Sequence, residues 1–273
     1  MIDVWRLVRA RNLLLAAAGV FAGGWIALEA VAWPKLLVLA AASGIGLGAA
    51  GNAANDVQDV VADRINAPGR HPLATGRLRH ETAHLVIWLG SVLGISAAAL
   101  VSGRVVFVAL VALAVMLAYS PLLKRRGLPG NFAVAAVGGL PLWYGALAMG
   151  RPAAGLVPWV LAAWLHLARE LVKDLEDEAG DRAAGRRTLP VRVGMPGAIR
   201  MTAWVCAAFV PAALILPLLS GYGWVYLAFA SLSFVLIGVA LVSLLRQRFV
   251  TAGGLLKVAM VFGLAALVLG KVV

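Results

Sequence analysis

Long apolar stretches alternate with short polar loops along the whole chain. Each stretch is near the length at which a helix crosses a bilayer, so the pattern predicts an all-α membrane protein with about nine transmembrane helices. The predicted segments cover residues 12–32, 35–55, 82–102, 104–119, 131–150, 154–173, 197–219, 223–245 and 251–270. Because no long polar linker interrupts them, we expect one polytopic domain over residues 1–273.

A short polar run follows the second apolar segment and reads GNAANDVQDVVADRINAPGRHPLATG from Gly51. At about 100° per residue, four of its polar side chains share a narrow arc of one helical face, with Asn55 at the edge of that arc. These four are Asn52, Asp56, Asp59 and Asp63. The helix should end near Asn66, because Pro68 disfavours helix at the residue before it. Three carboxylates on one face repel each other, and a divalent cation such as Mg²⁺ would relieve that repulsion.

A second acidic run reads ELVKDLEDEAGD from Glu170. In it, Asp174, Asp177 and Asp181 repeat the steps of three and four that separate the aspartates of the first run. Nine of the twelve acidic residues fall in these two runs, and arginines follow both. A solvated, charged helix end would explain one such run, but two runs with equal spacing indicate a metal and phosphate site. The repetition also suggests two related helical halves around one central cavity.

Composition and charge set the class and the orientation. The chain is 62% hydrophobic and 13% charged, its mean hydropathy is +0.93, and its net charge is +12. With the N-terminus inside, only four of the 24 Lys and Arg residues lie on the outer side, namely Lys35, Arg104, Arg151 and Lys271. Both acidic runs then face the cytoplasm, in a multi-pass protein of the cell membrane. The positive charge is explained by this asymmetry and by phosphate binding, so no nucleic-acid partner is expected.

The two runs are the motifs NDxxDxxxD at Asn55–Asp63 and DxxDxxxD at Asp174–Asp181. With the flanking words RINAPGRHPLATG, YSPLLKRRGLPGN and GRRTLP, the chain resembles the UbiA-type intramembrane prenyltransferases. Within that family it most resembles the branch that transfers a geranylgeranyl group to geranylgeranylglyceryl phosphate in ether-lipid synthesis. In many relatives an arginine follows the third motif position, whereas this chain has Val60 there.

The resemblance implies roles for individual residues. The metal ligands would be Asn55, Asp56, Asp59, Asp63, Asp174, Asp177 and Asp181. The diphosphate would be bound by Asn55, Arg64, Arg70, Lys124 and Arg182, with Tyr119 beside it. Glu170 and Lys173 would orient or deprotonate the acceptor, and they complete the catalytic set with Asp59, Asp63, Asp177 and Asp181. Arg125 and Arg126 are interpreted as ordinary anchors on the inner side. His71 lies inside the basic loop and could touch phosphate, although a structural role is favoured.

The resemblance also implies the substrates. The cofactor would be Mg²⁺, with Mn²⁺ as an alternative, and the donor a polyprenyl diphosphate whose chain lies among membrane lipids. The acceptor would be a small lipid phosphate. Two other hypotheses remain: prenylation of an aromatic quinone or pigment precursor by the same mechanism, and a transporter of divalent cations or phosphate compounds. A transporter is disfavoured because both acidic runs fall at helix ends on one side, so no relay crosses the bilayer.

Two stretches of small residues, AASGIGLGAAGNAA and AVAAVGG, contain no nucleotide-binding fingerprint. They are typical of close helix packing in membranes.

Overall fold

The computed structural model is built from helices, and no strand occurs in residues 2–66, 69, 71–123, 126–183 and 185–273, which the structure describes. The helices are α1 (Ile2–Leu7), α2 (Ala10–Leu28), α3 (Lys35–Asn66), α4 (His80–Ala99), α5 (Gly103–Ala118), α6 (Leu128–Ala148), α7 (Pro152–Glu176), α8 (Glu178–Ala183), α9 (Leu189–Leu219), α10 (Trp224–Leu245) and α11 (Phe249–Val272). A π-helical turn, η1 (Tyr119–Leu123), follows α5. The predicted all-α class is confirmed.

Eight of the described helices are long and apolar enough to cross a membrane. They match eight of the nine predicted segments, while the segment predicted at 104–119 is the shorter helix α5, with 16 residues. Pro121 explains the turn that follows α5, because its nitrogen cannot donate the α-helical bond to Leu117. Near the start of α9 the chain kinks at Gly194 (φ 76°), which separates Leu189–Val193 from the span predicted at 197–219.

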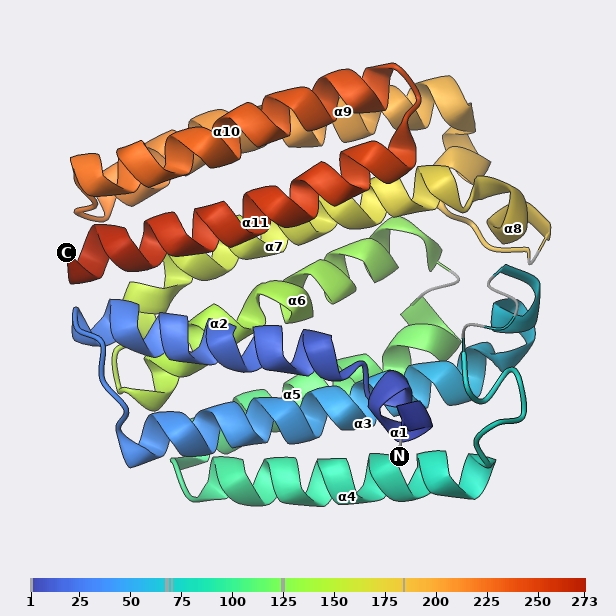
Figure 1. Cartoon of the computed structure of the whole chain (residues 1–273), viewed down its shortest axis with the longest axis horizontal. Helices are drawn as coiled ribbons and strands as arrows, with labels where there is room; N and C mark the ends of the chain where they lie inside the picture. The colour runs from blue at the N-terminus through green and yellow to red at the C-terminus, as the bar shows by residue number, and fades with distance from the viewer. Residues whose placement is uncertain (1, 67–68, 70, 124–125, 184) are drawn as a thin grey trace.

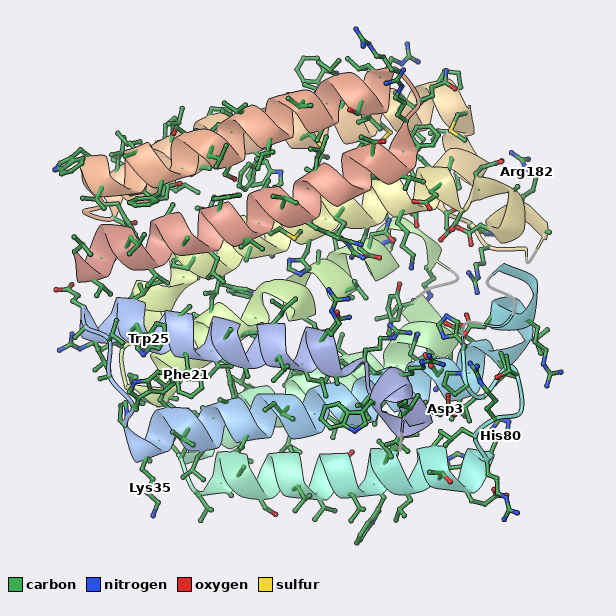
Figure 2. All side chains as sticks on the ribbon, viewed as in Figure 1. Asp3, Phe21, Trp25, Lys35, His80 and Arg182 are labelled. Carbon is green, nitrogen blue, oxygen red and sulfur yellow. The ribbon has the colours of Figure 1, made fainter. Side chains whose placement is uncertain are left out.

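The helices run side by side, and the ends of α3 and α7 that carry the acidic runs lie at the same end of the bundle (Figure 1). The opposite end holds Lys35, at the start of α3, and the C-terminus (Figures 1 and 2). Helix α3 ends at Asn66, as Pro68 predicts. The two acidic motifs, distant in the sequence, are therefore brought to one end.

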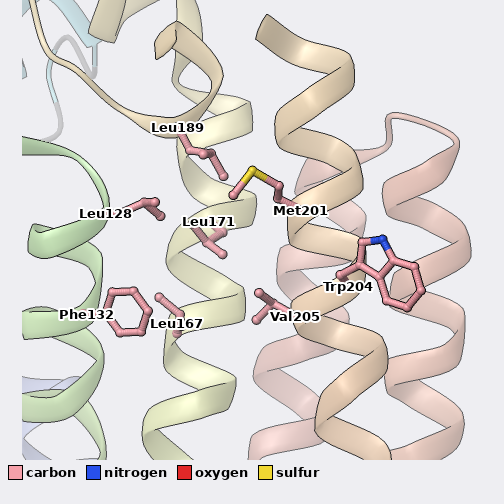
Figure 3. A pocket seen from close by; sticks show the side chains of 8 residues that line it. All are labelled: Leu128, Phe132, Leu167, Leu171, Leu189, Met201, Trp204 and Val205. Carbon is pink, nitrogen blue, oxygen red and sulfur yellow. The ribbon is translucent and has the colours of Figure 1, made fainter. Parts of the chain in front are cut away.

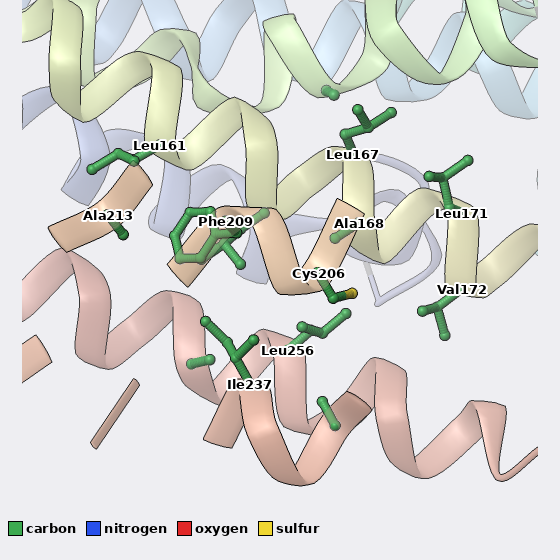
Figure 4. Packing of buried hydrophobic residues seen from close by; sticks show 14 of the residues in the cluster. Leu161, Leu167, Ala168, Leu171, Val172, Cys206, Phe209, Ala213, Ile237 and Leu256 are labelled. Carbon is green, nitrogen blue, oxygen red and sulfur yellow. The ribbon is translucent and has the colours of Figure 1, made fainter. Parts of the chain in front are cut away.

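Three apolar clusters form the buried core of the described part of the chain. One joins α7 to α9, α10 and α11, and its centre contains Phe209, Cys206, Ile237 and Leu256 (Figure 4). Another joins helices α2 through α6, and a smaller third cluster lies between α1, α3, α4 and the loop before α4. Outward-facing side chains such as Phe107, 68% exposed, are also apolar, as expected where helices face lipid.

Small residues allow neighbouring helices to touch, as the sequence predicts. A Cβ on Gly46 of α3 would lie 2.8 Å from the Gly90 carbonyl oxygen of α4. A Cβ on Gly139 of α6 would lie 2.6 Å from the Ala163 nitrogen of α7. Helices α3–α4 and α6–α7 therefore depend on glycine at these crossings.

Candidate functional site

The first acidic motif lies on the last turns of α3, and its aspartates face the protein interior. Asp56 is 1% exposed and Asp59 is 7% exposed. The Arg9 Nη2 atom donates a hydrogen bond of 2.8 Å to Asp56 Oδ1, and the Asn52 amide donates one of 2.9 Å to the Val8 carbonyl. Arg9 has a left-handed backbone (φ 52°) between α1 and α2. The motif face of α3 therefore also anchors the N-terminal segment.

His71 lies in the loop after α3 and closes this cluster from the other side. Its Nδ1 atom is 3.4 Å from Asp56 Oδ2 and 3.4 Å from Asp63 Oδ2. Sequence reasoning treated His71 as structural, because a lone histidine in a basic loop gives no spacing signal. The structure brings it against two of the predicted ligands.

The basic residues that follow the first motif serve partly to fold the loop. Arg64 Nε donates 3.0 Å to the Ala74 carbonyl, and Arg77 Nη2 donates 3.1 Å to the Gly69 carbonyl. Both bonds are exposed, so Arg64 lies at the surface beside the cluster. The predicted diphosphate ligands Arg70 and Lys124 lie outside the described residues.

The second motif is divided between two helices. Helix α7 ends at Glu176, Asp177 is its C-cap, and α8 begins at Glu178. The Asp181 amide still donates to the Asp177 carbonyl at 2.9 Å, so the chain turns without losing the helical bond. Asp181 is 3% exposed. Equal spacing in sequence thus gives one continuous helical face in α3 and a helix end in α7–α8.

Asn131 of α6 supports the second motif. Its Nδ2 atom donates a hydrogen bond of 2.7 Å to Asp174 Oδ2, and Asn131 is 6% exposed. Sequence analysis assigned Asn131 no role, although it closes the word YSPLLKRRGLPGN on which the resemblance partly rests. A buried amide that donates to a carboxylate fixes the direction of that carboxylate.

Arg186 connects the two motifs. Its Nη1 atom is 3.0 Å from Asp181 Oδ1, and its Nη2 atom is 3.8 Å from Asp59 Oδ1. Its side chain is 14% exposed. The predicted diphosphate ligand Arg182 instead donates to Glu178 within α8 at 2.8 Å, is 61% exposed, and points away from the bundle (Figure 2). Arg186 thus occupies the position expected for Arg182.

The remaining predicted residues lie around this pair of motifs. Tyr119 begins η1, which packs against α3 and α6. The Arg169 Nη1 atom donates a hydrogen bond of 2.6 Å to Glu170 Oε1. Lys173, on the same helix, is exposed. The structure therefore places Tyr119 on a turn that contacts the helix of the first motif, and Lys173 at the surface.

The donor atoms suit a divalent cation. One ligand atom each from Asp56, Asp63 and His71 lies within 4.8 Å of the others. Carboxylate oxygens are the ligands that Mg²⁺ prefers, and such sites leave positions for water and substrate phosphates. In addition, the Arg186 guanidinium contacts one carboxylate of each motif, Asp59 and Asp181. The described residues at the first motif therefore fit a divalent cation, and Arg186 lies where an anionic group could meet both motifs.

Comparison with known proteins identifies the family. Residues 16–260 match the UbiA prenyltransferase family. A digeranylgeranylglyceryl phosphate synthase of Halobacterium salinarum is 39% identical over 98% of this chain and 96% of its own length. A solved structure described as digeranylgeranylglyceryl phosphate synthase superposes with a TM-score of 0.82, at 23% identity, over 99% of this chain and 98% of that one. A UbiA homologue from Archaeoglobus fulgidus bound to DMAPP and Mg²⁺ superposes with a TM-score of 0.63, at 17% identity, over 97% and 99% of the two chains. The chain belongs to the UbiA prenyltransferase family.

Proposed function

We propose that this protein transfers a geranylgeranyl group from geranylgeranyl diphosphate to geranylgeranylglyceryl phosphate, which forms an ether-lipid precursor. The observation that carries the proposal is Arg186 between Asp59 and Asp181, because it joins the two acidic motifs into one site. The name of the Halobacterium relative, which aligns with 98% of this chain, supports this choice of acceptor.

The reaction breaks the bond between the first carbon of the donor chain and the diphosphate oxygen, and the electron pair leaves with the diphosphate. The acceptor hydroxyl oxygen forms the new ether bond to that carbon, and the hydroxyl proton departs. Negative charge grows on the diphosphate and positive charge on the carbon. Fixed cations near the diphosphate therefore lower the barrier, most strongly where water is excluded.

The metal-binding role falls to both motifs. In this proposal the metal ligands are Asn55, Asp56, Asp59, Asp63, Asp174, Asp177 and Asp181. When bound, Mg²⁺ would neutralise charge on the leaving diphosphate. The Archaeoglobus homologue bound to DMAPP and Mg²⁺ supports this cofactor.

The cations around the motifs would bind the phosphate groups. Arg186 is the best-placed described candidate, because it already contacts a carboxylate of each motif. Arg64, Arg70 and Lys124 remain proposed contacts, with the Tyr119 hydroxyl as a neutral donor. Arg182 is not among them, because it is exposed and paired with Glu178. Glu170 is the proposed group for orienting or deprotonating the acceptor hydroxyl. Its bond to Arg169 fixes the direction of its carboxylate, while Lys173 is exposed.

We further propose that residues 1–273 work as one domain and that the site faces the cytoplasm. The support for the orientation is the excess of Lys and Arg at the end of the bundle that carries the motifs. The chain of the donor would then lie within the bilayer, in the central cavity expected between the two halves, and be protected from water.

The first test is a membrane-fraction assay with labelled geranylgeranyl diphosphate, Mg²⁺ and geranylgeranylglyceryl phosphate. Parallel reactions contain 4-hydroxybenzoate or a naphthoate as acceptor, EDTA, or the Asp59→Ala protein. Glu176→Ala is the matched control, because Glu176 is an exposed carboxylate at the end of α7. We expect labelled diether phosphate from the wild type and from Glu176→Ala, and none with EDTA or Asp59→Ala.

Product with an aromatic acceptor alone would retain the prenyltransferase and overturn the ether-lipid acceptor. A wild-type protein that forms no product with any acceptor would overturn the proposed function itself.

A further inference from the structure

An apolar groove lies between α6, α7 and α9 (Figure 3). It has a volume of about 280 Å³, near the lower end of the range for small-ligand pockets. Its walls include Leu128 and Phe132 from α6, Leu167 and Leu171 from α7, and Trp204 and Val205 from α9. The aliphatic side chains and Phe132 face a space that has room for part of a hydrocarbon chain, while Trp204 points outward at its edge (Figure 3).

The α7 side chains that line the groove continue along the helix toward the second acidic motif. Leu167, Leu171 and Asp174 are separated by four and then three residues, so they lie in one stripe along α7. Asp174 is one helical turn beyond Leu171, a rise of about 4.5 Å. Asn131, next to Phe132, donates its hydrogen bond to Asp174. The Asn131–Asp174 pair therefore closes the apolar stripe with polar groups of the candidate site.

This end of the stripe is also basic. Leu189, which lines the groove, begins α9 directly after Arg186, Arg187 and Thr188. The Arg187 carbonyl packs against Gly127, where a Cβ would clash, so this basic segment crosses the start of α6. The Thr188 hydroxyl is buried and has no hydrogen-bond partner within the described part of the chain. A phosphate-headed lipid would meet both cations and a spare donor here.

The groove is open toward the bilayer. Phe132 is 59% exposed and Trp204 is 75% exposed, and both stand at its walls. A lipid chain can therefore enter sideways from the membrane, while its head remains at the motif end.

Two isoprenoid chains take part in the proposed reaction, and the groove suits one of them. The donor diphosphate must contact both motifs, yet none of the described groove residues comes from α2–α5, which include the helix of the first motif. The second lipid needs only to bring its hydroxyl to Asp174 and its phosphate to the nearby cations. We propose that this groove binds the isoprenoid chain of the acceptor lipid phosphate, an inference that rests on the function proposed above.

Filling the groove tests this assignment. Val205→Trp places an indole in the space, and Val235→Trp, 61% exposed on α10, is the matched control outside the groove. We expect Val205→Trp to raise KM for geranylgeranylglyceryl phosphate about tenfold, since displacing even two methylene groups costs that much. KM for geranylgeranyl diphosphate should stay within about twofold. The substitution weakens binding of the acceptor alone, equally in its ground state and in the transition state. An acceptor with a ten-carbon chain should be affected less than one with twenty carbons.

Two further measurements test the assignment even if the Val205→Trp protein does not fold. Phe132→Ala, at an exposed wall position, should raise the acceptor KM about threefold through lost contact area. A geranylgeranylglyceryl phosphate that carries a diazirine at the end of its chain, irradiated without donor, should label peptides that contain Phe132 or Val205.

The outcomes separate this inference from the function on which it rests. If the wild type forms no diether from this acceptor, the proposed function fails and the groove assignment fails with it. If the wild type forms diether but Val205→Trp changes only the donor KM, or neither KM, the groove does not bind the acceptor chain. Label confined to α2–α5 would overturn the assignment in the same way.

Discussion

The two acidic motifs have the same spacing and different surroundings. In the first, Asp56, Asp59 and Asp63 lie on one uninterrupted helix, α3. In the second, α7 ends just before Asp177, and Asp181 belongs to α8. A sequence spacing of three and four therefore fixes which residues can share a face only as long as the helix continues.

The partners of the motifs differ as well. Asp56 is held by Arg9 and His71, which fasten the N-terminal segment and the following loop to α3. Asp174 is held by the neutral amide of Asn131, and Asp181 by Arg186, which also reaches Asp59. One carboxylate of the first motif thus stabilises the local fold, while the second motif supplies the contact across the site. Variants can test this division.

The largest effects should come from removing one carboxylate of either motif. Asp63→Asn and Asp181→Asn should each lower kcat by about 10²–10³, the usual cost of losing one preorganised electrostatic contact to the transition state. Glu176→Gln, an exposed carboxylate nearby, should leave kcat within about twofold of the wild-type value. Diether formation in detergent or nanodiscs gives the rates. Near-normal kcat in either motif variant would show that the motifs are not used equally.

Arg186→Gln should have the next largest effect, because the side chain contacts both motifs. We expect kcat/KM for the donor to fall about 100-fold. The matched change Arg182→Gln should cost less than about threefold, since Arg182 is exposed and paired with Glu178. If Arg182→Gln lowers kcat/KM for the donor more than Arg186→Gln does, Arg182 is the diphosphate ligand, as the sequence predicted.

Asn131→Leu should reduce kcat/KM about tenfold, because Asp174 would lose a hydrogen bond to a charged acceptor. Asn131→Asp should be worse, since it puts a second carboxylate against Asp174. Titration of activity with Mg²⁺ distinguishes the two: the added charge should shift the Mg²⁺ dependence, whereas the leucine should not. Equal activity of both variants and the wild type would remove Asn131 from the site.

Arg9→Gln should have the smallest effect on catalysis and act on stability instead. It leaves the buried Asp56 carboxylate without its closest cation, which should cost about 2 kcal/mol of unfolding free energy. Arg11→Gln, an exposed neighbour, is the control and should be neutral. Thermal unfolding followed by intrinsic tryptophan fluorescence measures the difference. A loss of kcat without a loss of stability would show that Arg9 acts in the reaction and does not serve only to anchor the N-terminal segment.

The sequence by itself determined the class of the protein, the helical segments and the two motifs. Hydrophobic length and residue spacing are local properties, so the spans, the end of α3 near Asn66 and the grouping of aspartates could be predicted from them. The segment predicted at 104–119 matches α5 to within one residue at each end. Helix α7 extends three residues beyond its predicted end at 173, because local backbone bonding decides where a helix ends.

Only the tertiary structure decided which charged residues meet. Arg9, His71, Asn131 and Arg186 gave no distinctive spacing, yet each contacts an aspartate of the motifs. Arg182 and Arg186 are equally basic in sequence, but α8 turns the first outward to Glu178 and leaves the second between Asp59 and Asp181. Contacts between distant segments depend on how helices pack and where their ends turn, and one-dimensional spacing does not carry that information.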